Sequence, residues 1–348
     1  MIQVTRRLLL VCLCGAFGWA QEIASKVDEC VGAYLRDHRF MGSVLIAKGG
    51  KIVVEKGYGM ADLELDVPNA PQTKFRLGSI TKQFTAAAIL QLEEKGKLSV
   101  NDPISKYFTD SPAAWKSITI HHLLTHTSGI PNYTDFPGFM AHETRKPLTV
   151  LQLIETFEGK PLDFEPGSKW KYSNSAYELL GYVIEKLSGM SYEDYLQRNI
   201  FDRLDMQSSG YDHAAPILKN RASGYAAKNG TFENAAFLDM SIPYSAGSLY
   251  STVEDLYRWD RSLYTERVLS RKSIEKMYTP FKSNYAYGWE VQETPRKQYS
   301  HGGGIFGFST FIIRYPADDA FVVVLSNIQG APAGKIAGEL AAILLPKS

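Results

Sequence analysis

Cysteine is scarce in this chain, with only three among 348 residues. Two of them, Cys12 and Cys14, lie in an N-terminal segment that we expect to be removed, and neither follows a small residue as a lipoprotein signal would require. Only Cys30 then remains, which excludes an intramolecular disulfide.

The chain also lacks an excess of charge of either sign. It has 38 basic and 37 acidic residues, and removal of residues 1–20 would take away only Arg6 and Arg7 and leave 36 basic residues. A net charge so close to zero gives no electrostatic basis for binding nucleic acid or an anionic membrane surface. The sequence motifs, rather than the charge, favour a small-molecule or peptide substrate as the partner, and the sequence does not specify an oligomeric state.

A long hydrophobic run is missing as well. The apolar residues 8–17 are too few for a comfortable transmembrane span. They follow Arg6 and Arg7 and precede Gly18-Trp19-Ala20, which supplies small residues for cleavage before Gln21. The sequence thus predicts a signal peptide at residues 1–20 and export to the periplasm or the exterior, with no stable membrane anchor after cleavage.

The remaining 21–348 exceed the ~250–300 residues at which a single core tends to divide, so we expect two lobes. Short runs rich in apolar and β-branched residues predict a hairpin at 43–55 and an antiparallel pair at 308–326, and these would form one sheet from both chain ends. We predict an α+β fold with a sheet lobe at 21–98 and 245–348 and a helix-rich lobe at 99–244. No internal repeat or linker interrupts it.

The most informative stretch is Ser79-Ile80-Thr81-Lys82, which is followed by an alanine-rich, helix-forming run. Residues three apart share a helix face, so the Lys82 amine can reach the Ser79 hydroxyl if a helix begins near Ser79. Such a lysine activates a serine nucleophile, and a helix N-terminus favours a developing oxyanion. The alternative is a helix-capping serine with a surface lysine.

The Ser-x-x-Lys pattern is weak by itself, because it occurs three times. Ser168 and Lys171 lie in a turn after Glu165-Pro166-Gly167, and Ser273 and Lys276 open a charged helix that ends before Pro280. For these two copies a turn and a solvated helix face are the better interpretations.

Two later motifs single out Ser79. Tyr172-Ser173-Asn174 is the only Tyr-x-Asn in the chain, and His301-Gly302-Gly303 is the only His-x-Gly. In this order the three motifs resemble those of the serine β-lactamase and penicillin-binding-protein superfamily. The segments 122–130, 165–185 and 246–256 resemble its class C branch, which contains class C β-lactamases, D-alanyl-D-alanine carboxypeptidases, D-amino-acid peptidases and family VIII esterases. The resemblance covers about residues 42–327.

The resemblance implies a β-lactamase/transpeptidase-like fold in which a helix at 335–345 packs on the sheet. It implies that Ser79, Lys82 and Tyr172 are catalytic and that Asn174, His301 and Gly303 bind substrate. The N–H groups of Ser79 and Gly304 would form the oxyanion hole. A phenol is a poor base at neutral pH, but a nearby Lys82 ammonium favours phenolate, so Tyr172 and Lys82 would share the Ser79 proton.

The third motif departs from the Lys-Thr-Gly that many relatives carry. Neutral His301, with an ordinary pKa near ~6.5, would hold a substrate carboxylate less strongly than a lysine. Lys228-Asn229-Gly230 does not replace it, because Asn-Gly favours a type I′ hairpin turn. Class A enzymes pair the serine motif with Ser-Asp-Asn and a glutamate base, whereas this chain has Tyr-Ser-Asn.

No cofactor is predicted. His122 and His126 are four residues apart, but no glutamate follows His122 as a zincin motif requires. The glycines 302–304 lack the spacing of a phosphate-binding loop.

The sequence therefore predicts a secreted serine hydrolase that cleaves an ester, amide or β-lactam bond through an acyl-enzyme on Ser79. As its specific activity, β-lactamase, D-alanyl-D-alanine carboxypeptidase and carboxylesterase all remain open. The non-enzymatic alternative is a catalytically silent binder of penicillins or cell-wall peptides.

Overall fold

A computed structural model describes residues 2–108, 110–228 and 230–346, with the backbone alone for residues 2–17, 142 and 143. The helices are α1 (Ile2–Arg36), α2 (Thr81–Glu94), α3 (Ile120–Leu124), α4 (Phe139–His142), α5 (Val150–Glu158), α6 (Asn174–Ser188), α7 (Tyr192–Leu196), α8 (Asp202–Leu204), α9 (Tyr244–Gly247), α10 (Val253–Ser262), α11 (Arg271–Met277) and α12 (Ala333–Leu344). The strands are β1 (Gly42–Lys48), β2 (Lys51–Tyr58), β3 (Met60–Asp62), β4 (Val67–Pro68), β5 (Phe75–Arg76), β6 (Gly210–Tyr211), β7 (Tyr225–Lys228), β8 (Thr231–Asn234), β9 (Leu249–Ser251), β10 (Glu290–Gln292), β11 (Gln298–Ile305), β12 (Phe308–Tyr315), β13 (Ala320–Ser326) and β14 (Ile328–Gln329).

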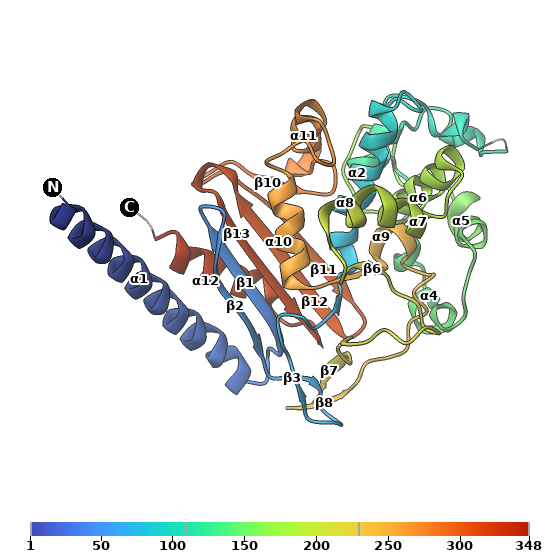
Figure 1. Cartoon of the computed structure of the whole chain (residues 1–348). Helices are drawn as coiled ribbons and strands as arrows, with labels where there is room; N and C mark the ends of the chain where they lie inside the picture. Colours follow the sequence, from blue (N-terminus) through green and yellow to red (C-terminus); the bar gives the residue numbers. More distant parts are fainter. Residues whose placement is uncertain (1, 109, 229, 347–348) are drawn as a thin grey trace.

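The largest sheet joins the two ends of the chain, as the sequence predicts. Its order is β10-β11-β12-β13-β1-β2, and the pairs within it are antiparallel. The predicted hairpin is β1–β2, whose turn residues Gly49 and Gly50 have positive φ, and the predicted C-terminal pair is β12–β13. The fold is therefore an antiparallel sheet flanked by helices, with helices gathered beside it (Figure 1).

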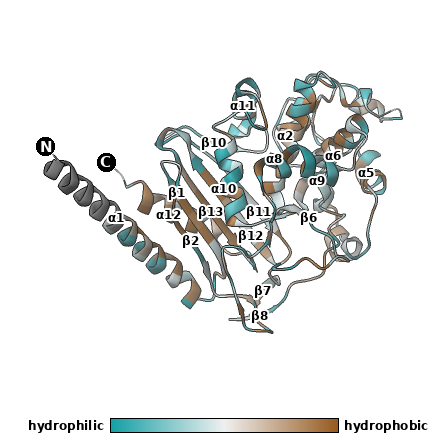
Figure 2. Cartoon of the chain, viewed as in Figure 1, coloured by the Kyte–Doolittle hydropathy of each residue, from teal (hydrophilic) through white to brown (hydrophobic). Residues whose placement is uncertain are grey.

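Strand periodicity decides which helices cover each face. Along β13, Phe321, Val323 and Leu325 belong to one buried cluster, while the alternating Val322 and Val324 belong to another. The hydrophobic colouring of the central strands reflects this burial on both faces (Figure 2). On one face lie α1 and α12, which confirms the predicted C-terminal helix, and on the other lies α10.

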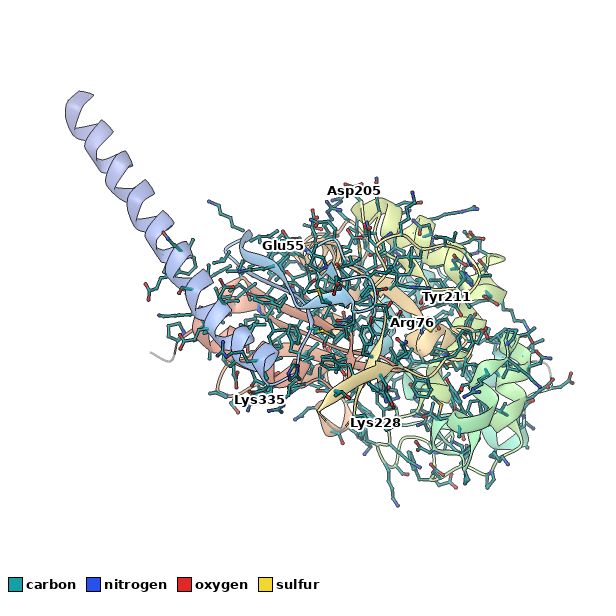
Figure 3. All side chains as sticks on the ribbon, turned by 90° about the horizontal axis from the view of Figure 1, so that it is seen from below. Glu55, Arg76, Asp205, Tyr211, Lys228 and Lys335 are labelled. Atoms are coloured by element: carbon teal, nitrogen blue, oxygen red, sulfur yellow. The ribbon has the colours of Figure 1, made fainter. Side chains whose placement is uncertain are left out.

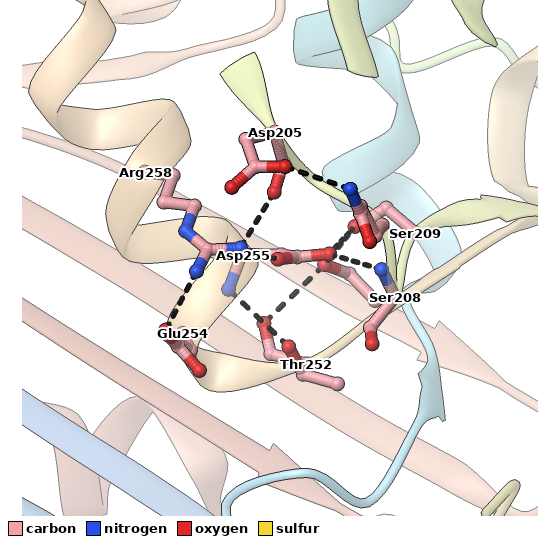
Figure 4. Close-up of polar contacts among 9 residues, drawn as sticks. Asp205, Ser208, Ser209, Thr252, Glu254, Asp255 and Arg258 are labelled. Carbon is pink, nitrogen blue, oxygen red and sulfur yellow. Dashed lines mark hydrogen bonds and ion pairs between the residues drawn. The ribbon is translucent and has the colours of Figure 1, made fainter. Parts of the chain in front are cut away.

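Helix α10 is fixed by a buried carboxylate at its N-terminus. Asp255 accepts hydrogen bonds from the Ser208 N–H and the Ser209 hydroxyl, both at 2.8 Å, and from Arg258 at 3.0 Å (Figure 4). Burial raises the pKa of Asp255, and these donors oppose that rise. The network ties α10 to the segment that precedes β6.

Helix α1 begins at Ile2 and passes beyond the predicted cleavage point after Ala20. The signal-peptide prediction falls mostly on residues 2–17, whose side chains lie outside the described part, and on Met1. Within the part of the chain that the structure describes, no helix combines the length and apolar character needed to cross a membrane.

Candidate active site

Ser79 lies where a strand gives way to a helix. Strand β5 ends at Arg76, a single 3-10 turn spans Gly78–Ile80, and α2 begins at Thr81. Gly78 has φ +55°, and a Cβ there would lie 3.0 Å from the Gly304 nitrogen. Glycine thus permits both the tight entry and the approach of β11, and Ser79 lies at the N-terminal end of α2 as predicted.

Two side chains contact the Ser79 hydroxyl oxygen. The Tyr172 hydroxyl donates to it at 2.7 Å, and the Lys82 amine lies 3.2 Å from it. Tyr172 comes from the segment before α6, 93 residues later in the chain. The fold therefore brings together the serine, lysine and tyrosine that the sequence motifs predicted to be catalytic.

Lys82 is completely buried, with 0% of its surface exposed. Its amine donates to the Asn174 side-chain oxygen at 2.8 Å and to the Ala246 carbonyl at 2.9 Å. Burial lowers the Lys82 pKa to about 7, and the nearby Glu178 carboxyl opposes this shift. Burial also raises the pKa of the Glu178 carboxyl well above its usual range, while Lys82 opposes that rise.

The pKa of Tyr172 is shifted in the opposite direction, upward. Burial raises its pKa above the ordinary value, although the hydrogen bond with Ser79 lowers it in part. The Lys82 nitrogen lies 4.8 Å from the centre of the Tyr172 ring. Near neutral pH Tyr172 is thus a protonated phenol, whereas a substantial fraction of Lys82 is a neutral amine, and this favours Lys82 as the proton acceptor.

Asn174 opens α6 and joins the site to the loop before α4. Its backbone N–H donates to the Asn132 side-chain oxygen at 2.9 Å, and its amide nitrogen donates to the Thr134 hydroxyl at 3.3 Å. The amide oxygen is thereby turned toward Lys82, so Asn174 both orients the lysine and borders the cavity.

His301 lies beneath the site and is only 3% exposed. Its Nε2 atom lies 2.8 Å from the Tyr285 hydroxyl and its Nδ1 atom 2.7 Å from the Gly302 carbonyl oxygen. It is absent from the lining of the cavity beside Ser79. The expected pKa near 6.5 is not found, because burial and the positive charge of Lys82 lower the His301 pKa to about 4.

This shift predicts a pH dependence of stability. Between about pH 4 and 6.5 the unfolded chain binds a proton at His301 that the folded chain excludes, so stability rises with pH across this window and falls on acidification. The stability associated with His301 is on the order of 3 kcal/mol at most. In denaturant unfolding, we expect the free energy of unfolding of His301→Gln to fall less between pH 6.5 and 4 than that of the wild type. An identical slope in the variant and the wild type would contradict this assignment.

The glycines of β11 lie against the turn that holds Ser79. A Cβ on Gly303 would lie 1.9 Å from the Leu77 carbonyl oxygen, so this position needs a glycine for close approach of the two backbones. Gly304 faces open space and lines the cavity with Ser79. Gly304 thus lies beside Ser79 at the cavity, whereas Gly303 packs against the backbone of Leu77.

A cavity of about 420 Å³ opens beside Ser79. Its lining side chains are mostly apolar, and among the described residues none of them is charged. The walls include Met140, Leu238, Ile242, Phe306 and Phe308. The surface beside Ser79 is therefore uncharged among the described residues.

Sequence reasoning did not find the aromatic layer beneath the site. The ring of buried His126 lies 4.3 Å from that of Tyr172 and 4.6 Å from that of Tyr285, and the Ser173 N–H donates to its Nδ1 atom at 3.2 Å. Burial lowers the His126 pKa well below its usual range. The unusual φ of +57° at His126 had no signal in the sequence.

The other patterns lie away from this site. Ser168 is in a turn and Ser273 lies in α11, as predicted. The His121 Nδ1 atom lies 2.8 Å from the Tyr287 hydroxyl, and the His122 side chain accepts a hydrogen bond from the N–H of Thr119, the N-cap of α3. The described side chains contain no group of three or more His, Cys, Asp or Glu placed to hold a metal ion. Strands β7 and β8 form the predicted hairpin, whose turn residue Asn229 lies outside the described residues.

Comparison with known proteins places this geometry in context. The profile of the family described as Beta-lactamase matches residues 27–345. The chain is 30% identical over 313 residues to the teichoic acid D-alanine hydrolase of Staphylococcus aureus, covering 88% of this chain and 74% of that protein.

Solved structures of penicillin-binding proteins share the fold of this chain. The octameric penicillin-binding protein homologue from Pyrococcus abyssi has a TM-score of 0.83 and 32% identity, over 93% of this chain and 78% of that one. The penicillin-binding protein from Bacillus halodurans has a TM-score of 0.79 and 30% identity, over 90% of this chain and 98% of that one.

Proposed function

The chain is a hydrolase of the beta-lactamase family, and from that premise we propose that Ser79 attacks an ester, amide or β-lactam carbonyl and forms an acyl-enzyme. The observation that carries the proposal is the convergence of Lys82 and Tyr172 on the Ser79 oxygen at 3.2 and 2.7 Å. We further propose, from the N-terminal residues 1–20, that the protein is exported.

The shifted pKa values suggest how the proton moves. Neutral Lys82 accepts the Ser79 proton while the Ser79 oxygen bonds to the carbonyl carbon. The N–H groups of Ser79 and Gly304 stabilise the oxyanion. When the bond to the leaving group breaks, the proton passes to that group through Tyr172, whose hydroxyl stays protonated. Water then hydrolyses the acyl-enzyme and restores Ser79.

The uncharged cavity favours some substrates over others. A C-terminal carboxylate next to the scissile bond would find no cationic side chain in the described lining, and His301 is both buried and neutral. Neutral esters and amides suit this surface better than a peptide that ends in D-alanyl-D-alanine. Esterase or amidase activity is therefore the leading specific function, with carboxypeptidase and β-lactamase activity as alternatives.

A substrate screen tests this order of substrate preference. The purified protein is assayed with p-nitrophenyl acetate, nitrocefin and a peptide ending in D-Ala-D-Ala, and kcat/KM is compared. We expect the ester to be hydrolysed most efficiently. Preferential release of D-alanine would instead favour the carboxypeptidase, and Ser79 acylation without turnover of any substrate would identify a silent binder.

A further inference from the structure

A second recess adjoins the cavity beside Ser79. It has a volume of about 330 Å³ and shares three wall residues with that cavity, Leu238, Phe306 and Phe308. Its lining also contains Arg76 and Arg221, and no lining residue among those described is acidic. Arg76, which is labelled in Figure 3, is the last residue of β5. The recess thus adds positive charge next to an uncharged cavity.

The two arginines share one buried counter-ion. Arg76 Nε lies 2.6 Å from one oxygen of Asp212, and Arg221 Nη1 lies 2.5 Å from the other. The Asp212 side chain is fully buried, whereas the side chains of Arg76 and Arg221 are 13% and 27% exposed. These two guanidinium groups and one carboxylate together carry an excess of one positive charge.

Donors remain available on both arginines. Among the described residues, the structure gives no hydrogen bond donated by the two terminal nitrogens of Arg76 or by Nη2 of Arg221. The Arg76 guanidinium carbon lies 5.9 Å from the centre of the Phe308 ring, the wall that the recess shares with the Ser79 cavity. Guanidinium groups bind carboxylate and phosphate oxygens strongly in such a setting.

Backbone pairing holds the arginines in place. Strand β9 lies between β5 and β6, and Tyr250 pairs with both Arg76 and Gly210, two residues before Asp212. On the other side, Arg221 forms a parallel bridge with Lys74. Nearby Asp62 contacts Ser223 at 3.0 Å but is absent from the recess lining. Backbone pairing thus positions Arg76 through the sheet β5-β9-β6 and Arg221 through its bridge with Lys74.

We propose that the recess is a second substrate subsite that binds an anionic group, a carboxylate or a phosphate, several bonds away from the scissile carbonyl. This inference rests on the proposed acylation of Ser79. The substrate then has an uncharged portion beside Ser79 and a distal anion between Arg76 and Arg221. The cavity and the recess together would favour substrates by the position of their negative charge as well as by the type of bond that is cleaved.

The test uses esters with one reactive aryl end and a distal methyl, carboxylate or phosphate group on linkers of increasing length. We expect kcat/KM for an anionic ester to exceed that of the matched methyl ester by roughly tenfold at one linker length. The advantage should shrink as salt is added. Comparison of the carboxylate and phosphate esters identifies which anion fits.

Arg221→Gln should lower this anionic-to-neutral ratio toward one, and Arg221→Lys should restore part of it. Arg258→Gln is the matched control, because Arg258 also pairs with a buried aspartate, Asp255, yet lies outside both cavities (Figure 4). A ratio near one at every linker length, or an equal fall in both glutamine variants, would overturn the subsite. Hydrolysis of the methyl ester separately reports whether Ser79 is active.

Discussion

Ser79→Ala is expected to abolish hydrolysis, with kcat falling by on the order of 10⁴-fold or more, because no other group can form the acyl bond. The wild-type protein should be labelled on Ser79 by a fluorophosphonate or a labelled penicillin. Peptide mass spectrometry after labelling locates the adduct. The variant should fold normally, since it loses only a hydroxyl at the cavity surface.

The chain provides matched controls for the nucleophile. Ser168→Ala and Ser273→Ala alter the serines of the other two Ser-x-x-Lys patterns, which lie in a turn and in α11. Both variants should retain labelling and turnover. An adduct on Ser168 or Ser273, or no adduct at all, would disprove the central assignment.

Lys82→Met should cause the next largest loss, larger than that of Tyr172→Phe. Lys82 is the group whose pKa falls to about 7, so it can accept the Ser79 proton, whereas Tyr172 stays protonated. We expect Tyr172→Phe to lower turnover by on the order of 10²-fold and Lys82→Met to lower it further. In the wild type, kcat/KM for a neutral ester should rise as the pH passes about 7, when Lys82 loses its proton.

Tyr192→Phe is the control for a lost buried hydroxyl. Tyr192 contacts Thr85 of α2 at 2.6 Å but does not touch Ser79, so its removal should affect stability more than turnover. Circular dichroism and denaturant unfolding separate folding defects from catalytic ones. If Lys82→Met kept the wild-type kcat, or if Tyr172→Phe lost more turnover than Lys82→Met, Tyr172 rather than Lys82 would be the base.

Much of the fold was predictable because local patterns are strong in the strands. The apolar, β-branched runs on either side of turn residues in 43–55 and 308–326 predicted the two hairpins that build the sheet from both chain ends. The boundaries of the helix-rich lobe at 99 and 244 stay predictions. The small sheet β5-β9-β6 and the pairing of β14 with the predicted β7–β8 hairpin had no such signal, because strands of two or three residues are too short to show a pattern.

The sequence by itself determined the chemistry that this chain carries: Ser79 one helical turn before Lys82, with Tyr172, Asn174 and the glycines of 302–304 in separate motifs. Spacing along a helix is a local property, so Ser79 and Lys82 were identifiable without a structure, and the resemblance to the superfamily motifs identified the other candidates. Only the tertiary structure decided the electrostatics. Burial lowers the pKa of Lys82 and of His301, removes His301 from the cavity, and brings Arg76, Asp212 and Arg221 together. Desolvation and long-range contacts depend on which segments pack together, and no local pattern encodes them.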